Sequence, residues 1–263
     1  MKAPATVVAA VLFATAALAE GPDNGFDREL YDRFVSMRMG DGDPVYWYSV
    51  GTLKSYPDGE LLFRMEGFDT ARRLESDDAP DRATQLSRKI YIYRDAQTNA
   101  VLRSYDGQPV EPIAYPYQLI SYDFKGAYME TWVEQGRGPF LQKIGPGTDI
   151  LARRVGDSVI FSAPLFLDLE TPAGPLQAFE NYDFVIQPEG AVSVPNQLSW
   201  VRYGDGPEFA GAPKTIFHLV SWRVDRFEDL PETIRAYIET DAPLWQRPPE
   251  SLDEIRALQQ AED

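Results

Sequence analysis

The stretch from Pro44 to Phe68 constrains the fold most, because its pattern predicts a long β-hairpin. Its first half is crowded with Val, Tyr, Trp and Thr, side chains that pack well on a pleated sheet. In its second half Phe63 and Met65 alternate with Arg64 and Glu66, the period of two that is typical of a strand with unlike faces. An aspartate–glycine pair between the halves supplies the positive φ that a tight turn requires. The rest of the chain is therefore expected to lie beside this hairpin.

Further segments show the same strand chemistry, separated by turn residues. They cover 84–94, 101–105, 126–134, 153–167, 177–187, 197–203 and 215–224. Three other stretches are expected to be loops, namely the charged 70–82, the proline-rich 109–118 and the glycine-rich 136–147. About nine or ten strands joined by sequential hairpins predict an all-β-dominated fold, an antiparallel β-barrel of the calycin type. A two-sheet β-sandwich is the alternative.

Helices are expected on either side of this barrel domain, which covers 44–225. In the N-terminal helix segment, 20–43, apolar residues recur at helical spacing between Gly25 and Met39. This stripe predicts an N-terminal helix that packs on the outside of the sheet. In 226–263 two C-terminal helices are expected to pack on the same domain, the second of them behind a capping box from Ser251 to Glu254.

The first nineteen residues are predicted to be a signal peptide, 1–19, rather than part of the fold. Lys2 precedes an apolar run, and Ala17 and Ala19 are small residues at the positions that signal peptidase recognises. The run is shorter than the roughly 20 apolar residues that a membrane-spanning helix needs. We expect cleavage after Ala19, release as a periplasmic or secreted protein, and no stable membrane anchor afterwards.

Composition excludes several classes of function. The chain has 41 acidic and 25 basic residues and a formal charge of -16, which repels nucleic acid and anionic lipid. It has no cysteine and one histidine, His218, which excludes thiol nucleophiles, thiolate metal sites and sites that need two imidazoles. It contains neither a Gly-x-Ser-x-Gly elbow nor a glycine-rich nucleotide-binding pattern. We therefore expect no metal, no cofactor and no nucleic-acid partner, and a small molecule as ligand or substrate.

Three aromatic strand motifs, taken in order, carry a family resemblance. PVYWYSVGTL is followed by LLFRMEGF and then by the tyrosine-rich SRKIYIYRDAQTNAVL. Over Asp32 to Trp132 this order resembles an exported family catalogued as domain of unknown function number 1838. The resemblance implies an exported, strand-rich domain. It implies no particular activity, because the family has no assigned activity and the motifs are aromatic rather than catalytic.

A barrel of this size has room for side chains and one small ligand, so its inward-facing residues are the candidates for a site. Histidine is the side chain that most readily exchanges protons near neutral pH, which makes His218 the catalytic candidate, with Glu66 as a carboxylate partner. The apolar neighbours of His218 predict that it is buried, either in the core or at a cavity. Glu66 and Arg64 line the cavity if Phe63 and Met65 face an outer helix, and they form a surface pair in the opposite case.

The high aromatic content, 13% of the chain, suggests a ligand that stacks on rings, although cross-strand packing is the alternative role for each ring. The candidate ligand-binding residues are Tyr46, Tyr48, Arg64, Tyr91, Tyr93, Glu130, Trp132, Trp200, Arg202 and Trp222.

Three functional hypotheses remain at this point. The first is an exported barrel protein that binds a small apolar or aromatic molecule in its cavity. The second is a cofactor-independent lyase, isomerase or cyclase that uses His218 with tyrosine or carboxylate partners. The third is an envelope interaction module without a cavity.

Overall fold

The computed structural model describes residues 25–74, 79–137, 140–147, 150–171, 174–188 and 195–261. The expected signal peptide, 1–19, and the acidic stretch 75–78 lie outside the described residues. Within the described part of the chain, one eleven-stranded antiparallel sheet is accompanied by three α-helices and three short 3₁₀ segments. The barrel-like, all-β-dominated fold is confirmed. None of the helices in the described ranges is long and apolar enough to cross a membrane.

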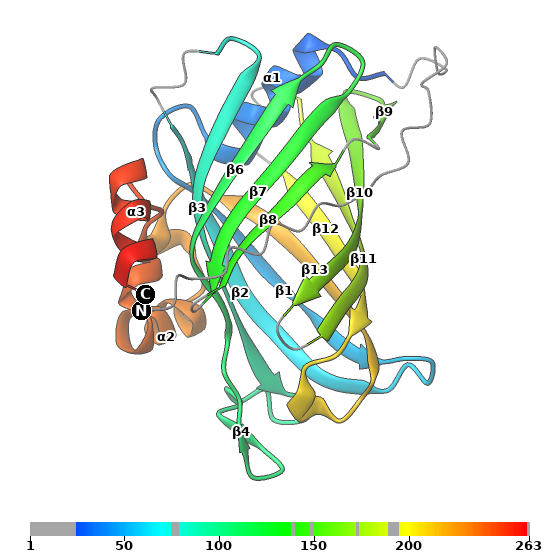
Figure 1. Ribbon diagram of the computed structural model, residues 1–263, viewed down its shortest axis with the longest axis vertical. Coiled ribbons are helices and arrows are strands. Elements are labelled where there is room, and N and C mark those ends of the chain that lie inside the picture. The colour runs from blue at the N-terminus through cyan, green and yellow to red at the C-terminus, as the bar shows by residue number, and fades with distance from the viewer. Residues whose placement is uncertain are drawn as a thin grey trace.

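The predicted hairpin lies in the middle of this sheet. Neighbouring strands follow the order β8-β7-β6-β3-β2-β1-β13-β12-β11-β10-β9 (Figure 1). The strands are β1 Val45–Ser55, β2 Leu61–Arg73, β3 Arg82–Asp95, β6 Ile113–Phe124, β7 Met129–Arg137, β8 Phe140–Gly147, β9 Leu151–Val155, β10 Ser158–Thr171, β11 Gly174–Ile186, β12 Gln197–Asp205 and β13 Lys214–Val224. Two further short strands, β4 Ser104–Tyr105 and β5 Gln108–Pro109, form a separate ladder. At the turn between β1 and β2, Gly59 has a φ of 73°, as the aspartate–glycine pair predicts.

The packing of helix α1, Arg28–Met39, shows that the sheet curls back on itself. The ring centroid of Phe34 lies 5.2 Å from that of Tyr122 on β6 and 4.9 Å from that of Phe161 on β10. These two strands are seven positions apart in the sheet order. One side chain can therefore reach both only because the sheet is rolled into a half-barrel. Helix α1 packs on the inner, concave face of that half-barrel at one end (Figure 1).

The expectation that this helix packs on the outside of the sheet is therefore wrong. A helix on an outer surface keeps one polar side, whereas α1 buries residues on most of its circumference. Its buried residues are Leu30, Tyr31, Phe34, Val35, Met37, Arg38 and Met39. We call the apolar residues around it, contributed by strands from both halves of the sheet, the α1 cluster.

A second apolar cluster covers the opposite end of the inner face. This far-end cluster contains Leu53, Phe63, Met65, Tyr93, Val110, Phe217 and Leu219. Phe209, from the 3₁₀ segment η1 Glu208–Ala210, packs across it with its ring centroid 5.5 Å from Phe63 and 5.1 Å from Tyr93. Apolar packing thus covers both ends of the inner face and leaves a polar middle between them.

The C-terminal helices pack on the outer face of the same sheet (Figure 1). Helix α2, Glu232–Asp241, follows the short segment η2, Phe227–Asp229, and buries Ile234 and Ile238 against Phe68 of β2 and Ile90 of β3. The segment η3, Pro243–Gln246, leads on to α3, Leu252–Ala261, which covers Leu86 and Tyr117.

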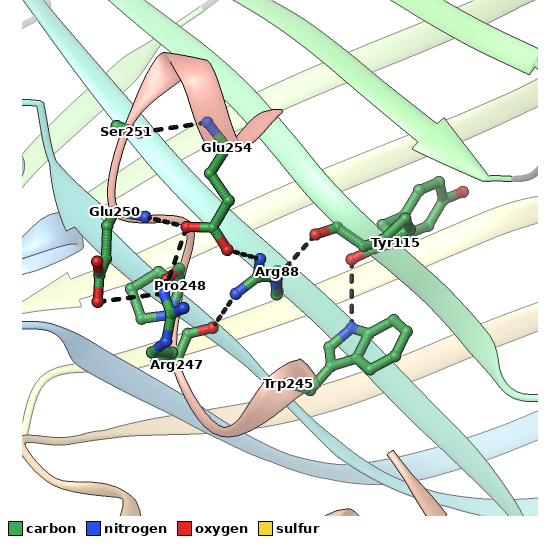
Figure 2. Close-up of polar contacts among 9 residues, drawn as sticks. Arg88, Tyr115, Trp245, Arg247, Pro248, Glu250, Ser251 and Glu254 are labelled. Carbon is green, nitrogen blue, oxygen red and sulfur yellow. Dashed lines mark hydrogen bonds and ion pairs between the residues drawn. The ribbon is translucent and has the colours of Figure 1, made fainter. Parts of the chain in front are cut away.

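A set of polar contacts fastens this C-terminal region to the sheet (Figure 2). Arg88 on the outer face of β3 donates to the carbonyl oxygen of Arg247 at 2.7 Å and to Oε1 of Glu254 at 2.6 Å. The N–H of Glu254 in turn donates to Oγ of Ser251 at 3.2 Å, as the capping box predicts. The carboxylate of Glu254 reaches back to the N–H of Glu250 at 2.8 Å. One carboxylate therefore both caps α3 and holds it on the sheet.

Two of the expected loops are strands. The prolines of 109–118 predict a crossing loop, yet β6 includes Pro116 and pairs on both sides, with β3 and β7. The β3–β6 register shifts between Ser87 and Lys89, so Pro116 lies at a bulge, where the missing N–H breaks no ladder bond. The stretch 136–147 contains β8, an edge strand. An edge strand tolerates proline and glycine because it forms backbone hydrogen bonds with a neighbouring strand on one side only.

Two other expectations need smaller corrections. The loop expected over 70–82 begins later, because β2 continues to Arg73 and β3 already starts at Arg82. The strand expected over 101–105 is reduced to a bridge from Val101 to Arg94 and to the two residues of β4.

Candidate functional site

The pairing of strands decides which side chains face the inside of the half-barrel. Trp47 on β1 belongs to the α1 cluster and is paired with Asp69 on β2, which is paired with Lys89 on β3. Paired residues of an antiparallel sheet share one face, so all three point inward. The same reasoning places further polar and aromatic residues between the two apolar clusters. We define the inner belt as Ser49, Asp69, Lys89, Tyr91, Glu180, Tyr182, Trp200, Arg202 and Ser221 of the sheet, together with Arg38 of α1.

The first part of the inner belt is a buried ion pair between α1 and β2. Arg38, in the last turn of α1, pairs with Asp69, and both side chains are buried. Burial lowers the pKa of Arg38, but the attraction of Asp69 outweighs this and leaves the pKa above its ordinary value. Its guanidinium also lies 5.6 Å from the ring centroid of Trp47. The end of the helix is thus tied to the middle of the inner face.

A second part gathers around Glu180 on β11. Its carboxylate accepts hydrogen bonds from the hydroxyl of Tyr182 at 2.6 Å and from Nε1 of Trp200 at 3.0 Å. Nε of Arg202 completes the group at 3.4 Å. Burial and the neighbouring Glu180 raise the pKa of Tyr182 well above its ordinary value, so this phenol stays protonated and donates its hydrogen bond.

The β1–β13 seam contributes hydroxyl groups to the belt. Oγ of Ser49 lies 2.7 Å from Oγ of Ser221 and 3.4 Å from the hydroxyl of Tyr91. Burial raises the pKa of Tyr91. Gly67, beside Tyr91 in the β2–β3 ladder, makes room for this ring, because a Cβ there would lie 2.5 Å from Cδ1 of Tyr91. A larger residue at this position would also lie 2.1 Å from the carbonyl oxygen of Ile90, so it would force the β3 backbone as well as the ring to move.

Lys89 differs from the other charged members of the belt. Burial lowers its pKa, although Asp69 and Glu180 are near enough to act in the opposite direction. The described residues give it no hydrogen bond and no ion pair, and its ammonium lies 6.0 Å from the ring centroid of Tyr115. Because the sheet curls back on itself, Lys89 on β3 and Glu180 on β11 lie on opposite sides of the belt.

The inner belt retains both solvent contact and unused hydrogen-bonding capacity. Five of its side chains are only half-buried although apolar clusters cover both ends of the inner face: Lys89, Tyr91, Tyr182, Trp200 and Arg202. Around them, buried polar atoms lack partners within the described part of the chain: Nη1 of Arg38, Oδ1 of Asp69, Nε2 of Gln85, Oγ of Ser87 and Oε1 of Gln118. Buried polar groups are normally satisfied by protein, water or ligand, so this region is chemically suited to hold a polar guest.

Four of the sequence-predicted site residues lie on this inner face. Tyr91, Trp200 and Arg202 belong to the inner belt, and Tyr93 lies deeper, in the far-end cluster. The ring centroid of Tyr93 is 6.0 Å from that of Phe63 and 5.1 Å from that of Phe209, so its ring is occupied by packing.

Glu66 and the residues near it lie on the outer face, beneath α2. The carboxylate of Glu66 is held by Nε of Arg94 at 2.6 Å, by the hydroxyl of Tyr48 at 2.9 Å and by the hydroxyl of Thr233 at 3.0 Å. Tyr46, on the same face, donates to the carbonyl oxygen of Gln246 at 2.9 Å. These residues fasten α2 and η3 to the sheet and do not reach the inner belt. The alternative in which Arg64 and Glu66 line the cavity is therefore wrong.

The remaining candidates also point outward. His218 is exposed, and its Nε2 lies 3.3 Å from Oγ of Ser199; the expectation that it is buried is wrong, because the outer side of β13 here has no helix over it. Arg64 is exposed and donates to the carbonyl oxygen of Ala96. The others on this face are Glu130, Trp132 and Trp222.

Several belt residues are not among those predicted from the sequence, including Arg38, Asp69, Lys89, Glu180 and Tyr182. For Lys89 a signal was present, because it alternates in phase with Tyr91 and Tyr93 on a strand whose other face holds Ile90 and Ile92. A lysine in phase with aromatic residues on a two-sided buried strand predicts an inward cation.

A separate pocket of about 300 Å³ lies outside the belt, beside α1. Three arginines and two aspartates contribute to its lining, but Arg28 is already paired with Asp32 and Asp81, and Arg82 with Asp123. These cations are therefore less available to a ligand than Lys89 is.

Comparisons with known proteins assign no family to the chain. A scan against protein-family models and searches of curated proteins and of solved structures gave no significant match. The resemblance to the exported family therefore stays a prediction. In the described ranges, no group of three or more His, Asp or Glu side chains is arranged to hold a metal ion.

Proposed function

We propose that this protein binds a small molecule with an aromatic or apolar body on the inner face of its half-barrel. The observation that supports this most is the half-buried state of Tyr91, Tyr182 and Trp200 between two apolar clusters. Side chains in such a place retain contact surface for a guest, and aromatic rings offer stacking area at low entropic cost. Export to the periplasm or medium belongs to the same proposal and rests on the sequence of residues 1–19.

The proposal is tested by titrating the purified protein with the neutral fluorescent probe N-phenylnaphthylamine. Replacing Trp200 by Ala is expected to weaken binding about tenfold, because it removes stacking area worth about 1.5 kcal/mol. The matched control is Trp222→Ala, which removes the same side chain from the outer face and is expected to leave affinity unchanged. Equal effects of the two substitutions would overturn the placement of the site.

The second candidate function is a cofactor-independent lyase, isomerase or cyclase. What favours it is that Lys89, Tyr91, Glu180 and Tyr182 bring proton donors and acceptors together on one surface. His218 takes no part in this version, since it is exposed on the other face. Mass spectrometry of the ligand that co-purifies with the protein separates the two functions: a molecule recovered unchanged after incubation supports binding, and conversion supports catalysis.

A further inference from the structure

The charges of the inner belt do not balance. Arg38, Lys89 and Arg202 contribute three cations, while Asp69 and Glu180 contribute two carboxylates. Both carboxylates have a cationic partner already: Asp69 pairs with Arg38, and Glu180 with Arg202. One positive charge is left over.

That charge resides on Lys89. The described residues offer its ammonium no ion pair and no hydrogen bond, and the ammonium lies over the ring of Tyr115, 6.0 Å from its centroid. An aromatic face attracts a cation but does not neutralise it. A half-buried cation without a counterion is costly unless another anion completes the site. Surface lysines avoid this cost because water solvates them, whereas Lys89 points to the interior of the half-barrel.

The neighbours of Lys89 limit what that anion can be. Aromatic side chains of Tyr91, Tyr182 and Trp200 share the inner face with it, so a guest would meet rings on its body and one cation at its acidic end. Two carboxylates nearby, on Asp69 and Glu180, would repel a guest with several negative charges. A single acidic group on an aromatic body fits this arrangement.

This inference rests on the proposed binding of a small molecule on the inner face. We propose that Lys89 is the anchor for the acidic group of the ligand and that the ligand is an aromatic monocarboxylate. The carboxylate forms the ion pair that Lys89 lacks, and the aromatic body packs against the tyrosines and Trp200. No covalent step is involved.

The test compares two probes that share one body and differ in one charge: naphthoate and its neutral amide, naphthamide. Isothermal titration of the full exported chain measures both affinities. In the wild-type protein naphthoate is expected to bind at least tenfold more tightly than naphthamide. Lys89→Met is expected to abolish this preference while changing the affinity for naphthamide less than twofold. Lys89→Arg keeps the charge and is expected to keep most of the preference.

Lys54→Met is the matched control, because Lys54 lies on the outer face of β1 and is exposed. It removes the same net charge and is expected to leave both affinities unchanged. A loss of naphthoate preference in this variant as well would show that only the overall charge matters and would overturn the proposal.

The number of protons taken up on binding tests the role of Lys89 directly, because a purely structural lysine would not change its protonation when the ligand binds. An anion bound to Lys89 favours its charged form, so binding should raise the pKa of Lys89, which burial lowers in the free protein. In alkaline buffers naphthoate binding is therefore expected to take up protons, seen as a binding enthalpy that depends on the ionisation enthalpy of the buffer. Lys89→Met should remove this dependence.

The outcomes separate the two proposals. If neither naphthamide nor the neutral fluorescent probe binds, or if Trp200→Ala has no effect on their binding, the proposed binding function of the inner face is overturned. The proposal that Lys89 anchors the ligand is then overturned as well. If neutral probes bind through Trp200 but Lys89→Met leaves the naphthoate preference intact, the anchor alone is overturned.

Discussion

Two polar groups on opposite faces of the same three strands, one buried and one half-buried, differ in how fully their charges and hydrogen bonds are satisfied. On the outer face, Glu66 is held by Arg94, Tyr48 and Thr233. On the inner face, Lys89 has no ion pair in the described part of the chain, and Oδ1 of the adjacent Asp69 is unpartnered. A satisfied network stabilises the packing of a helix, whereas an unsatisfied one costs stability and is retained where a ligand completes it. The contrast separates a carboxylate that holds a helix on the sheet from the cation that we propose as a ligand anchor.

The largest effect is expected when the satisfied group is broken. Glu66→Gln removes the charge opposite Arg94 while keeping the shape, and it leaves a buried guanidinium without its counterion. We expect a loss of about 3 to 5 kcal/mol in the free energy of unfolding, measured by denaturant titration. A loss below about 1 kcal/mol would mean that this pair behaves as a surface pair and would remove the contrast.

Substitutions on the two faces of β2 are expected to differ in their cost to stability. Phe63→Ala and Met65→Ala empty positions in the far-end cluster, so each should cost about 2 to 5 kcal/mol. Arg64 lies between them in sequence but its side chain is exposed on the other face. Arg64→Ala is therefore expected to lower the free energy of unfolding by about 0 to 1 kcal/mol. Denaturant melts that ranked Arg64→Ala as the most damaging would reverse the assignment of faces.

The contacts of Glu254 are expected to depend on pH. Burial raises the pKa of Glu254, but the N–H of Glu250 and the guanidinium of Arg88 more than offset this, so the pKa lies below its ordinary value. A carboxyl with a lowered pKa stabilises the folded state above its unfolded pKa of about 4.3 and loses that contribution as pH falls through the folded pKa. Glu254→Gln should therefore cost about 1.5 to 3 kcal/mol at neutral pH.

The measurement is the pH dependence of unfolding in both proteins. The difference between wild type and Glu254→Gln should shrink as the solution is made acidic. A difference that stayed constant down to low pH would contradict the role of the charge.

Lys89→Met is expected to change the free energy of unfolding in the opposite direction to Glu66→Gln. Because an unpaired, half-buried charge is removed, we expect the free energy of unfolding to rise by about 1 to 2 kcal/mol. The folded-state pKa of Lys89 is lowered, so the gain should be largest at neutral pH and vanish as pH rises through the ordinary lysine range. Thermal melts of both proteins across this range test it, and a destabilised variant would contradict an unpaired Lys89.

The smallest effect is expected at His218. Its side chain is exposed and its nearest polar contact is Ser199, so His218→Gln should change stability by less than about 0.5 kcal/mol. Binding of neutral and acidic probes should also be unchanged. Loss of binding or turnover with an unchanged melting temperature would restore His218 as a site residue.

The sequence predicted what alternation and turn chemistry can encode. The hairpin, most strands, α1 and the capped C-terminal helix follow from local patterns that the structure keeps. The predictions that were wrong concern segments whose conformation depends on the strands beside them. Pro116 is tolerated in β6 because it lies at a bulge against β3, and β8 is a strand because an edge strand pairs with a neighbour on one side only. Neither neighbour relation is visible in the segment itself.

The site was predicted less well, for the same physical reason. A strand pattern shows which residues share a face but not which face turns inward. Tyr91, Trp200 and Arg202 were found because they are aromatic or lie beside aromatic residues. Glu180 and Lys89 lie on strands far apart in the chain, and only the curl of the sheet turns these strands toward each other.

The position of α1 has a consequence for how the chain folds. The helix comes from the first described residues, yet its packing partners extend to Leu198 on β12. Contacts between residues so distant in sequence form late and slow the folding reaction. A chain that emerges N-terminus first from a ribosome or an export channel therefore carries an uncovered apolar helix until most of its strands have followed. During that interval it is prone to aggregate, which makes the unfinished protein a natural client for chaperones that shield apolar segments.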